Sequence, residues 1–311
     1  MNKIFLFFLL LFCSTALGAQ VNRYDSSAQV LPFWRVGEGQ RYLVTTDKYR
    51  IVGKDTLQRR RFKLDAEVEV TDSSESGYTM EWRYQNPYLN TITDPNIILF
   101  LGLYQNRIVK VNTDPYGNFE SVENWEELRD QAQKVLEDMK AVNQPDNAAL
   151  GTMIREITEY TDSRKDLEAA LIKDIRLFYT FFGEIYKFND KVVVNVKMPN
   201  VYGDKPFDAK EETLLSDIND KEQTAVLRRW LVADQEQFHD GVYDYMKKNM
   251  PIDDDPDNDL PYRDEIPPMS REDRISMKIH CGTGWVMFGM IVREVDMGTL
   301  LSMEEITLEM E

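Results

Sequence analysis

The residues of this sequence that are best suited to chemistry are the aspartates of an acidic segment near its C-terminal end. Asp253, Asp255 and Asp257 stand at the first, third and fifth places of an EF-hand-like loop, and Asp264 stands at the twelfth. Ca²⁺ prefers hard oxygen ligands, and side chains at alternating positions of such a loop surround one ion. The spacing therefore predicts a Ca²⁺ site at these four aspartates, and we expect no other cofactor.

Departures from the EF-hand pattern favour a different interpretation of the same segment. Asn258 stands where the loop needs Gly, Pro256 and Pro261 restrict its backbone, and Asp264 replaces the usual bidentate Glu. The alternative is a solvated acidic loop over residues 251–268 that binds no metal.

A cysteine nucleophile is the next candidate for chemistry. Cys281 ends a run of alternating apolar residues, 275–281, and so shares the buried face of a strand. A catalytic thiol needs a histidine base, yet His280 points to the opposite face and His239 is the only other histidine. We therefore expect Cys281 to be a small buried hydrophobic residue.

Recognisable catalytic motifs are missing from the sequence. It contains no glycine-rich phosphate loop, no serine elbow and no pair of histidines at metal spacing. Its 54 acidic residues allow almost any pair, such as Glu67 with Glu81, to be nominated as acid and base. We predict no catalytic residue, and a hydrolase with a carboxylate-based site is the alternative from the enzyme class.

The charge of the chain narrows the choice of partners. The formal net charge is −17, and such a surface repels nucleic acids and anionic lipid headgroups. We therefore expect no nucleic-acid partner. With 42% hydrophobic residues, the chain can bury a sizeable core.

The first nineteen residues have the composition of a secretory signal. Lys3 precedes an unbroken apolar run, 4–12, and small residues follow at positions 16–19. The run is too short for a transmembrane helix, which needs about 20 apolar residues. We predict a cleaved signal peptide at residues 1–19, no transmembrane segment, and an exported protein that is periplasmic or secreted. Cleavage of the signal peptide would remove Cys13 and leave one cysteine, so no intrachain disulfide is expected.

Two β regions and a helical insert must position any site. Between residues 41 and 122, apolar and charged residues alternate, and one strand carries an aromatic inner face of Tyr78, Met80, Trp82 and Tyr84. Residues 123–187 have helical periodicity, with Ser163 as the cap of a helix whose apolar stripe extends to Ile185. Strands resume from residue 191 to 311.

These patterns predict an α+β fold: a curved, mostly antiparallel sheet of about nine to eleven strands, covered by the helical insert. We assign residues 20–311 to a single domain, and two smaller sheets with their own helices are the alternative. In the last strand, the apolar residues change phase around Glu304 and Glu305, which predicts a β-bulge there.

A ligand slot is one consequence of such a fold. Trp82 and Tyr84 on the sheet, with Phe178 and Phe182 on the covering helix, can line a slot for an apolar molecule. The alternative is that the same rings fill the core.

A short stretch resembles a known group of proteins. Residues 111–129 pass from a strand through a turn with Gly117 to Phe119, and then into a helix at Asn124 and Trp125. This stretch resembles uncharacterised secreted proteins of the Bacteroidota, which have a similar order of signal peptide, β-meander, helical insert and strands. The resemblance implies a cell-envelope or secreted location. The layout is also similar to LolA-like carriers, in which an open half-barrel closed by helices holds lipid acyl chains.

Our leading hypothesis is an exported, non-enzymatic binding or interaction module of the cell envelope, with an envelope protein as one partner class. The main alternative is a carrier of an apolar small molecule or lipid, held between the sheet and the helices.

Overall fold

The computed structural model describes residues 21–22, 26–90, 101–142, 148–161, 163–200, 202–203, 205–249 and 262–311. The predicted signal peptide at residues 1–19 lies outside the described residues. So do Asp253, Asp255 and Asp257 of the predicted Ca²⁺ site.

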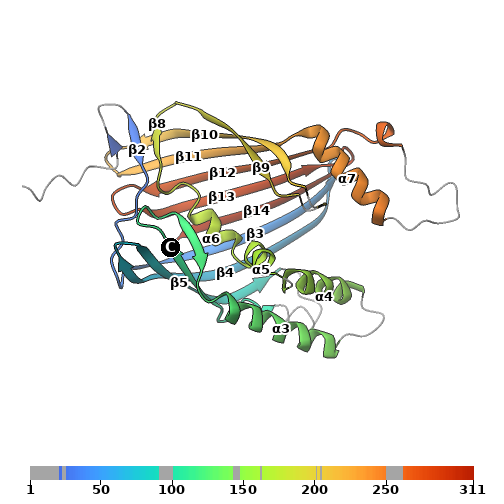
Figure 1. Ribbon diagram of the computed structural model, residues 1–311, viewed down its shortest axis with the longest axis horizontal. Helices are drawn as coiled ribbons and strands as arrows, with labels where there is room; N and C mark the ends of the chain where they lie inside the picture. Colours follow the sequence, from blue (N-terminus) through green and yellow to red (C-terminus); the bar gives the residue numbers. More distant parts are fainter. Residues whose placement is uncertain are drawn as a thin grey trace, which may run out of the picture.

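One eleven-stranded antiparallel sheet is the frame of the protein (Figure 1). Its strand order is β7-β6-β5-β4-β3-β14-β13-β12-β11-β10-β9, so pairing between β3 and the C-terminal β14 joins the two β regions. This arrangement confirms the predicted α+β fold with a large antiparallel sheet. The strands are β3 (Gly39–Val52), β4 (Asp55–Ser74), β5 (Gly77–Leu89), β6 (Ile108–Thr113), β7 (Phe119–Val122), β9 (Val192–Met198), β10 (Phe207–Asn219), β11 (Thr224–Ala233), β12 (Ser270–His280), β13 (Trp285–Asp296) and β14 (Leu300–Met310).

Helices cover one face of this sheet. The short helices α5 (Arg164–Leu171) and α6 (Lys173–Phe178) lie across it, and α6 contacts β13 and β14 (Figure 1). α3 (Trp125–Val142) packs on α4 (Ala148–Thr161), and α7 (Gln235–Asn249) packs on β12 and β10. The remaining elements of the described residues are β1 (Val21–Asn22), β2 (Ser27–Gln29) and β8 (Ile185–Lys187), which form a small sheet, and a 3₁₀ turn, η2 (Arg263–Glu265).

The helix that begins at Ser163 is shorter than its apolar stripe predicts. The Ser163 side chain caps α5, but Ile172 adopts a non-helical conformation between α5 and α6. Helix α6 ends at Phe178, and Gly183, with a φ of 86°, turns the chain into β8. Ile185 is therefore a strand residue, and its side chain is 61% exposed. Periodicity alone could not detect a turn that keeps successive apolar residues on the core side.

The predicted bulge in the last strand is wrong. β14 pairs in unbroken register with both β13 and β3 across Glu304 and Glu305. Leu301 and Met303 lie on the outer face, whereas Ile306 and Leu308 face the helices. The change of phase arises because Glu304 occupies a helix-side position, where the alternation leads one to expect an apolar residue.

Two apolar cores lie between the sheet and the helices. The main core draws on both β regions and on α3 to α6, so the two halves of the sheet share one interior. A second, smaller core lies beneath α7 and contains Phe207, Phe238 and Val242.

Candidate functional site

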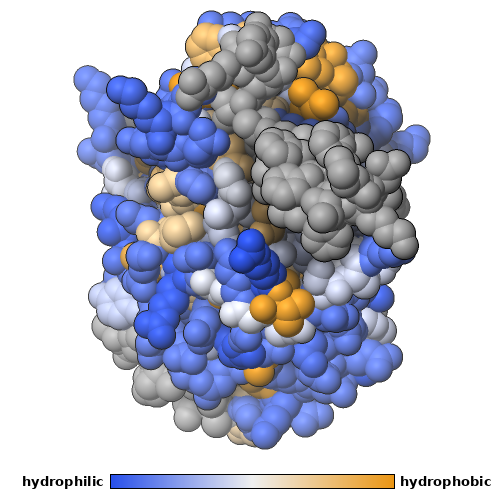
Figure 2. Space-filling view, turned by 90° about the vertical axis from the view of Figure 1, so that its left-hand side faces the viewer, coloured by the Kyte–Doolittle hydropathy of each residue, from blue (hydrophilic) through white to orange (hydrophobic). Residues whose placement is uncertain are grey.

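The helix-side face of the sheet holds an aromatic cluster at one end. It is made of Trp34, Tyr42, Trp82, Tyr84, Phe178, Tyr179, Phe182 and Trp285. All of these side chains are buried. From outside, this end of the molecule is mainly hydrophilic, with apolar residues in small separate groups (Figure 2).

The four residues predicted to bind a ligand come together in this cluster. Trp82 packs edge-on against Phe178, with ring centroids 5.4 Å apart, and Phe178 stacks on Phe182 at 5.7 Å. Tyr84 stacks beside Trp82 at 6.4 Å. The rings therefore contact one another and fill the core, and ligand binding by these four residues stays a prediction.

Three polar atoms of the aromatic cluster form no hydrogen bond of good geometry with any described residue. They are Trp34 Nε1, Tyr42 Oη and Trp82 Nε1, all fully buried; Trp82 also lies within reach of the Tyr179 hydroxyl, where it opposes the rise in the pKa of Tyr179 that burial causes. Their rings surround Phe178, with centroid distances of 5.9, 6.0 and 5.4 Å. A buried polar group without a partner costs about 1–3 kcal/mol, so three in one core are unusual. The cluster thus offers hydrogen-bonding groups that the described residues do not use.

A buried polar triad borders the aromatic cluster. Tyr84 Oη donates a hydrogen bond of 2.7 Å to Asp174 Oδ2 at the start of α6. The guanidinium of Arg107 lies 4.3 Å from the centre of the Tyr84 ring and 4.7 Å from that of Tyr104. Burial raises the pKa of Asp174, and the positive charge of Arg107 opposes that shift. The triad fixes α6 on the sheet, because each charged group depends on the others for solvation.

Beyond the aromatic cluster, a row of charged residues crosses the same face. Arg60, Lys48, Glu304, Arg293 and Asp273 are successive register partners on β4, β3, β14, β13 and β12. They face the helices because side chains two positions away on the same strands, such as Ile306, lie in the main core. We call these five residues the charged row.

Glu304 is the centre of the charged row. Its carboxylate lies 3.2 Å from Lys48 Nζ, 3.1 Å from Lys173 Nζ of α6 and 3.0 Å from Arg293 Nη1. Burial alone would raise the pKa of Glu304, but Lys173, Lys48 and Arg293 lower it to about 2. Burial, with the nearby charges of Lys48 and Arg293, lowers the pKa of Lys173 despite its contact with Glu304. Glu304 therefore stays ionised and binds three cations at once.

Asp273 continues the row toward β12. Its carboxylate accepts hydrogen bonds from Arg293 Nε and lies 3.5 Å from Arg271 Nε. Together, Lys48, Lys173, Arg293 and Arg271 carry four positive charges against the two negative charges of Glu304 and Asp273. This face is thus locally cationic in a protein whose formal net charge is −17.

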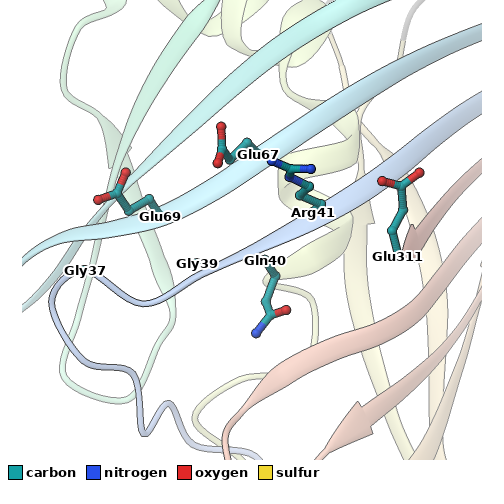
Figure 3. Close-up of a pocket in the computed structure, with 7 residues that line it drawn as sticks. All are labelled: Gly37, Gly39, Gln40, Arg41, Glu67, Glu69 and Glu311. Atoms are coloured by element: carbon teal, nitrogen blue, oxygen red, sulfur yellow. The ribbon is translucent and has the colours of Figure 1, made fainter.

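An open depression on the other face of the sheet is lined by carboxylates (Figure 3). Glu67 and Glu69 project from β4 beside Arg41, whereas Glu311 stands apart on the far side of Arg41. Arg83 ion-pairs with both Glu69 and Glu81, so the carboxylates near this depression face solvent and basic side chains. In the part of the chain that the structure describes, no three metal-binding side chains converge. The hydrolase with a carboxylate-based site stays a prediction that this geometry does not test.

Two further sequence candidates can be placed. Asp264 lies in η2, and its side chain is 94% exposed, 3.6 Å from Arg263. The Ca²⁺ site stays a prediction, because its other three aspartates lie outside the described residues. Cys281 is buried, which confirms the expectation for its side chain, and burial raises its pKa to about 11. His280 Nδ1 forms a hydrogen bond of 2.9 Å with Thr283 Oγ1 and not with the Cys281 thiol.

The charged row is the feature that sequence reasoning missed. The available sign was a charged residue in phase with apolar neighbours, as with Arg60 before Phe62 and Leu64, or Glu304 before Ile306 and Leu308. In each strand alone, this looks like the end of the buried segment. Only the register of five strands shows that these positions form one row.

Comparisons with known proteins do not assign the chain to a family. No family model matches the sequence, and no curated protein matches it. Among solved structures, it is similar to a chain described as "Lipid-protein interactions in lipovitellin", with a TM-score of 0.42 and 7% identity. The match covers 89% of this chain and 25% of the lipovitellin chain, so this chain spans about a quarter of that protein. Among the described residues, no helix has the length and apolar character needed to cross a membrane.

Proposed function

We propose that this protein is an exported, non-enzymatic binding module whose helix-side face takes up an apolar molecule with a polar end. The ligand lies along the aromatic cluster, beneath α5 and α6. The observation that carries the proposal is the change along one face of the sheet, from the buried aromatic cluster around Tyr42 to the basic side chains around Lys48. An amphiphile that lay along this face would place its chain against the aromatic rings and its polar end beside the basic side chains.

The covering elements support a site that opens. α5 and α6 are helices of 8 and 6 residues, separated by the non-helical Ile172. Isolated helices of this length are unstable, so their order depends on packing against the sheet. A rearrangement at Ile172 would move α6 and its Phe178 out of the aromatic cluster, and it would break the Tyr84–Asp174 hydrogen bond and the Lys173–Glu304 ion pair.

Along the helix-side face, apolar residues give way to basic ones, and this order suits an amphiphile. On β3, this face changes from Tyr42 and Val44 to Lys48 and Arg50. The distance from Tyr42 to Lys48 is about 20 Å at the rise of an antiparallel strand. That distance matches a long acyl chain whose polar end reaches the charged row.

The test is binding of cis-parinaric acid, a fluorescent fatty acid, to the purified full chain. Phe182→Leu leaves space within the aromatic cluster, because leucine is smaller than phenylalanine. Phe238→Leu is its matched control, since Phe238 is also buried but belongs to the second core. We expect the wild-type chain to bind cis-parinaric acid saturably. The affinity should change in Phe182→Leu and stay the same in Phe238→Leu. Absence of saturable binding by the wild-type chain, together with a native mass equal to the polypeptide alone, would refute the proposal.

A further inference from the structure

Three basic side chains, two of the charged row and one beside it, lie at the solvent-accessible end of the row. Lys48 and Arg60 are direct partners across β3 and β4, and Arg50 lies two positions from Lys48 on the same face. The Lys48 side chain is 59% exposed, and Arg50 and Arg60 are exposed. They stand at the end of the face that lies furthest from the aromatic cluster. We refer to Lys48, Arg50 and Arg60 as the basic triplet.

The charges of the basic triplet are not balanced by the described residues. Among the described residues, Glu304 is the one carboxylate in contact with the triplet, and it is already shared between Lys48, Lys173 and Arg293. Arg50 and Arg60 form no ion pair with the described part of the chain. Arg59 and Arg61, by contrast, point to the outer face, where both lie against Asp47. Alternation along β4 thus places Arg60, which has no ion pair among the described residues, on the helix side between the paired Arg59 and Arg61.

We infer that the basic triplet is an anion subsite that binds the carboxylate or phosphate group of an amphiphilic ligand. The inference rests on the proposed function for the ligand's apolar part, but the anion chemistry stands on its own. Arginine donates paired hydrogen bonds that match the oxygens of a carboxylate or phosphate. The neighbouring Glu304 is neutralised by Lys173 and Arg293 as well as by Lys48, so it does not repel the anion strongly.

The same subsite explains how an acidic protein can accept an anion. With a formal net charge of −17, the surface repels anions at long range. The positive charges that attract the anion are those of the basic triplet itself, because salt screens charges that lie further away than a Debye length of about 8–10 Å. Attraction is therefore local, and it should weaken as the salt concentration rises.

The test compares two double variants that remove the same charge from opposite faces of β3 and β4. Arg50→Gln with Arg60→Gln alters the basic triplet, and Arg41→Gln with Arg59→Gln is the matched control on the outer face. We expect oleate affinity to fall roughly 3- to 30-fold in the first variant, because two exposed charge contacts are lost, and to be unchanged in the control. Binding of oleyl alcohol, which has the same tail without the charge, should be unchanged in both.

Inorganic phosphate is the second arm, read by NMR shifts of amides in β3 and β4. If no apolar probe binds but phosphate shifts these amides in wild type and not in Arg50→Gln with Arg60→Gln, the proposed function fails and the anion subsite stands with a free anion as its ligand. If oleate responds and phosphate does not, the ligand is the headgroup of an amphiphile. The inference is overturned if neither the oleate affinity nor the phosphate shifts differ between the two double variants.

Discussion

Replacing Glu304 by glutamine should weaken the whole helix-side face. The substitution keeps the size of the side chain but removes the negative charge that Lys48, Lys173 and Arg293 share. Glu304 is only 14% exposed, so water replaces little of the lost interaction. Three cations would then face one another around a neutral amide.

The magnitude follows from the pKa of Glu304. The folded protein lowers this pKa from 4.5 to about 2. Each unit of pKa corresponds to about 1.4 kcal/mol, so ionised Glu304 stabilises the fold by about 3 kcal/mol near neutral pH. We expect Glu304→Gln to lower the free energy of unfolding by about this amount.

The pH dependence gives the prediction a sign. Because the pKa is lower in the folded state, the stabilisation is complete above the unfolded pKa of 4.5 and is lost as the pH falls toward 2. The difference in unfolding free energy between wild type and Glu304→Gln should therefore shrink to roughly half near pH 3. It should nearly vanish near pH 2.

The assay is urea unfolding followed by tryptophan fluorescence, across this pH range. Glu305→Gln is the matched control, because Glu305 is the next residue and points to the outer face, without an ion pair to any described residue. It should cost under about 0.5 kcal/mol, as surface substitutions usually do. Equal losses in the two variants, or a Glu304→Gln loss that does not change with pH, would refute the account of the charged row.

Two further predictions concern the frame and the thiol. Gly77→Ala should destabilise the protein by about 2 kcal/mol or more, because Gly77 has a φ of 140° and a Cβ there would lie 1.8 Å from Thr113 O. The control is Gly151→Ala, whose new methyl group would have nothing within 4 Å. Equal urea midpoints for the two variants would contradict the geometry. Burial that raises the pKa of Cys281 from 9.0 to about 11 leaves roughly 100-fold less thiolate, so Ellman's reagent should modify the native protein far more slowly than the urea-unfolded chain. Comparable rates in the two states would show that Cys281 is accessible in the native protein.

The strands were the most predictable part of this protein. The alternation around Phe62 and Leu64 predicted β4 with the correct buried face, and the alternation before Cys281 did the same for β12. A period of two is a local property, so it survives without knowledge of partners. The helix after Ser163 was less predictable, because a turn at Ile172 leaves the apolar spacing almost unchanged.

The candidate site, too, was predictable in one part and not in another. Trp82 and Phe178 could be assigned to one aromatic layer because both faced a common core by their own periodicity. The partners of Glu304 could not be identified, since Lys48 and Lys173 are more than 100 residues away in the sequence. Charge, spacing and composition say nothing about which strands are neighbours.

The sequence by itself determined the class of the fold and the inward-facing residues of its strands, because side-chain alternation is written into each strand separately. The tertiary structure decided that β14 pairs with β3, and this single pairing places Glu304 beside Lys48. Register across the sheet then converts isolated charged residues on five strands into one row beside an aromatic cluster. The reason is physical: cross-strand neighbours are set by long-range backbone hydrogen bonding, which no local pattern of residues specifies.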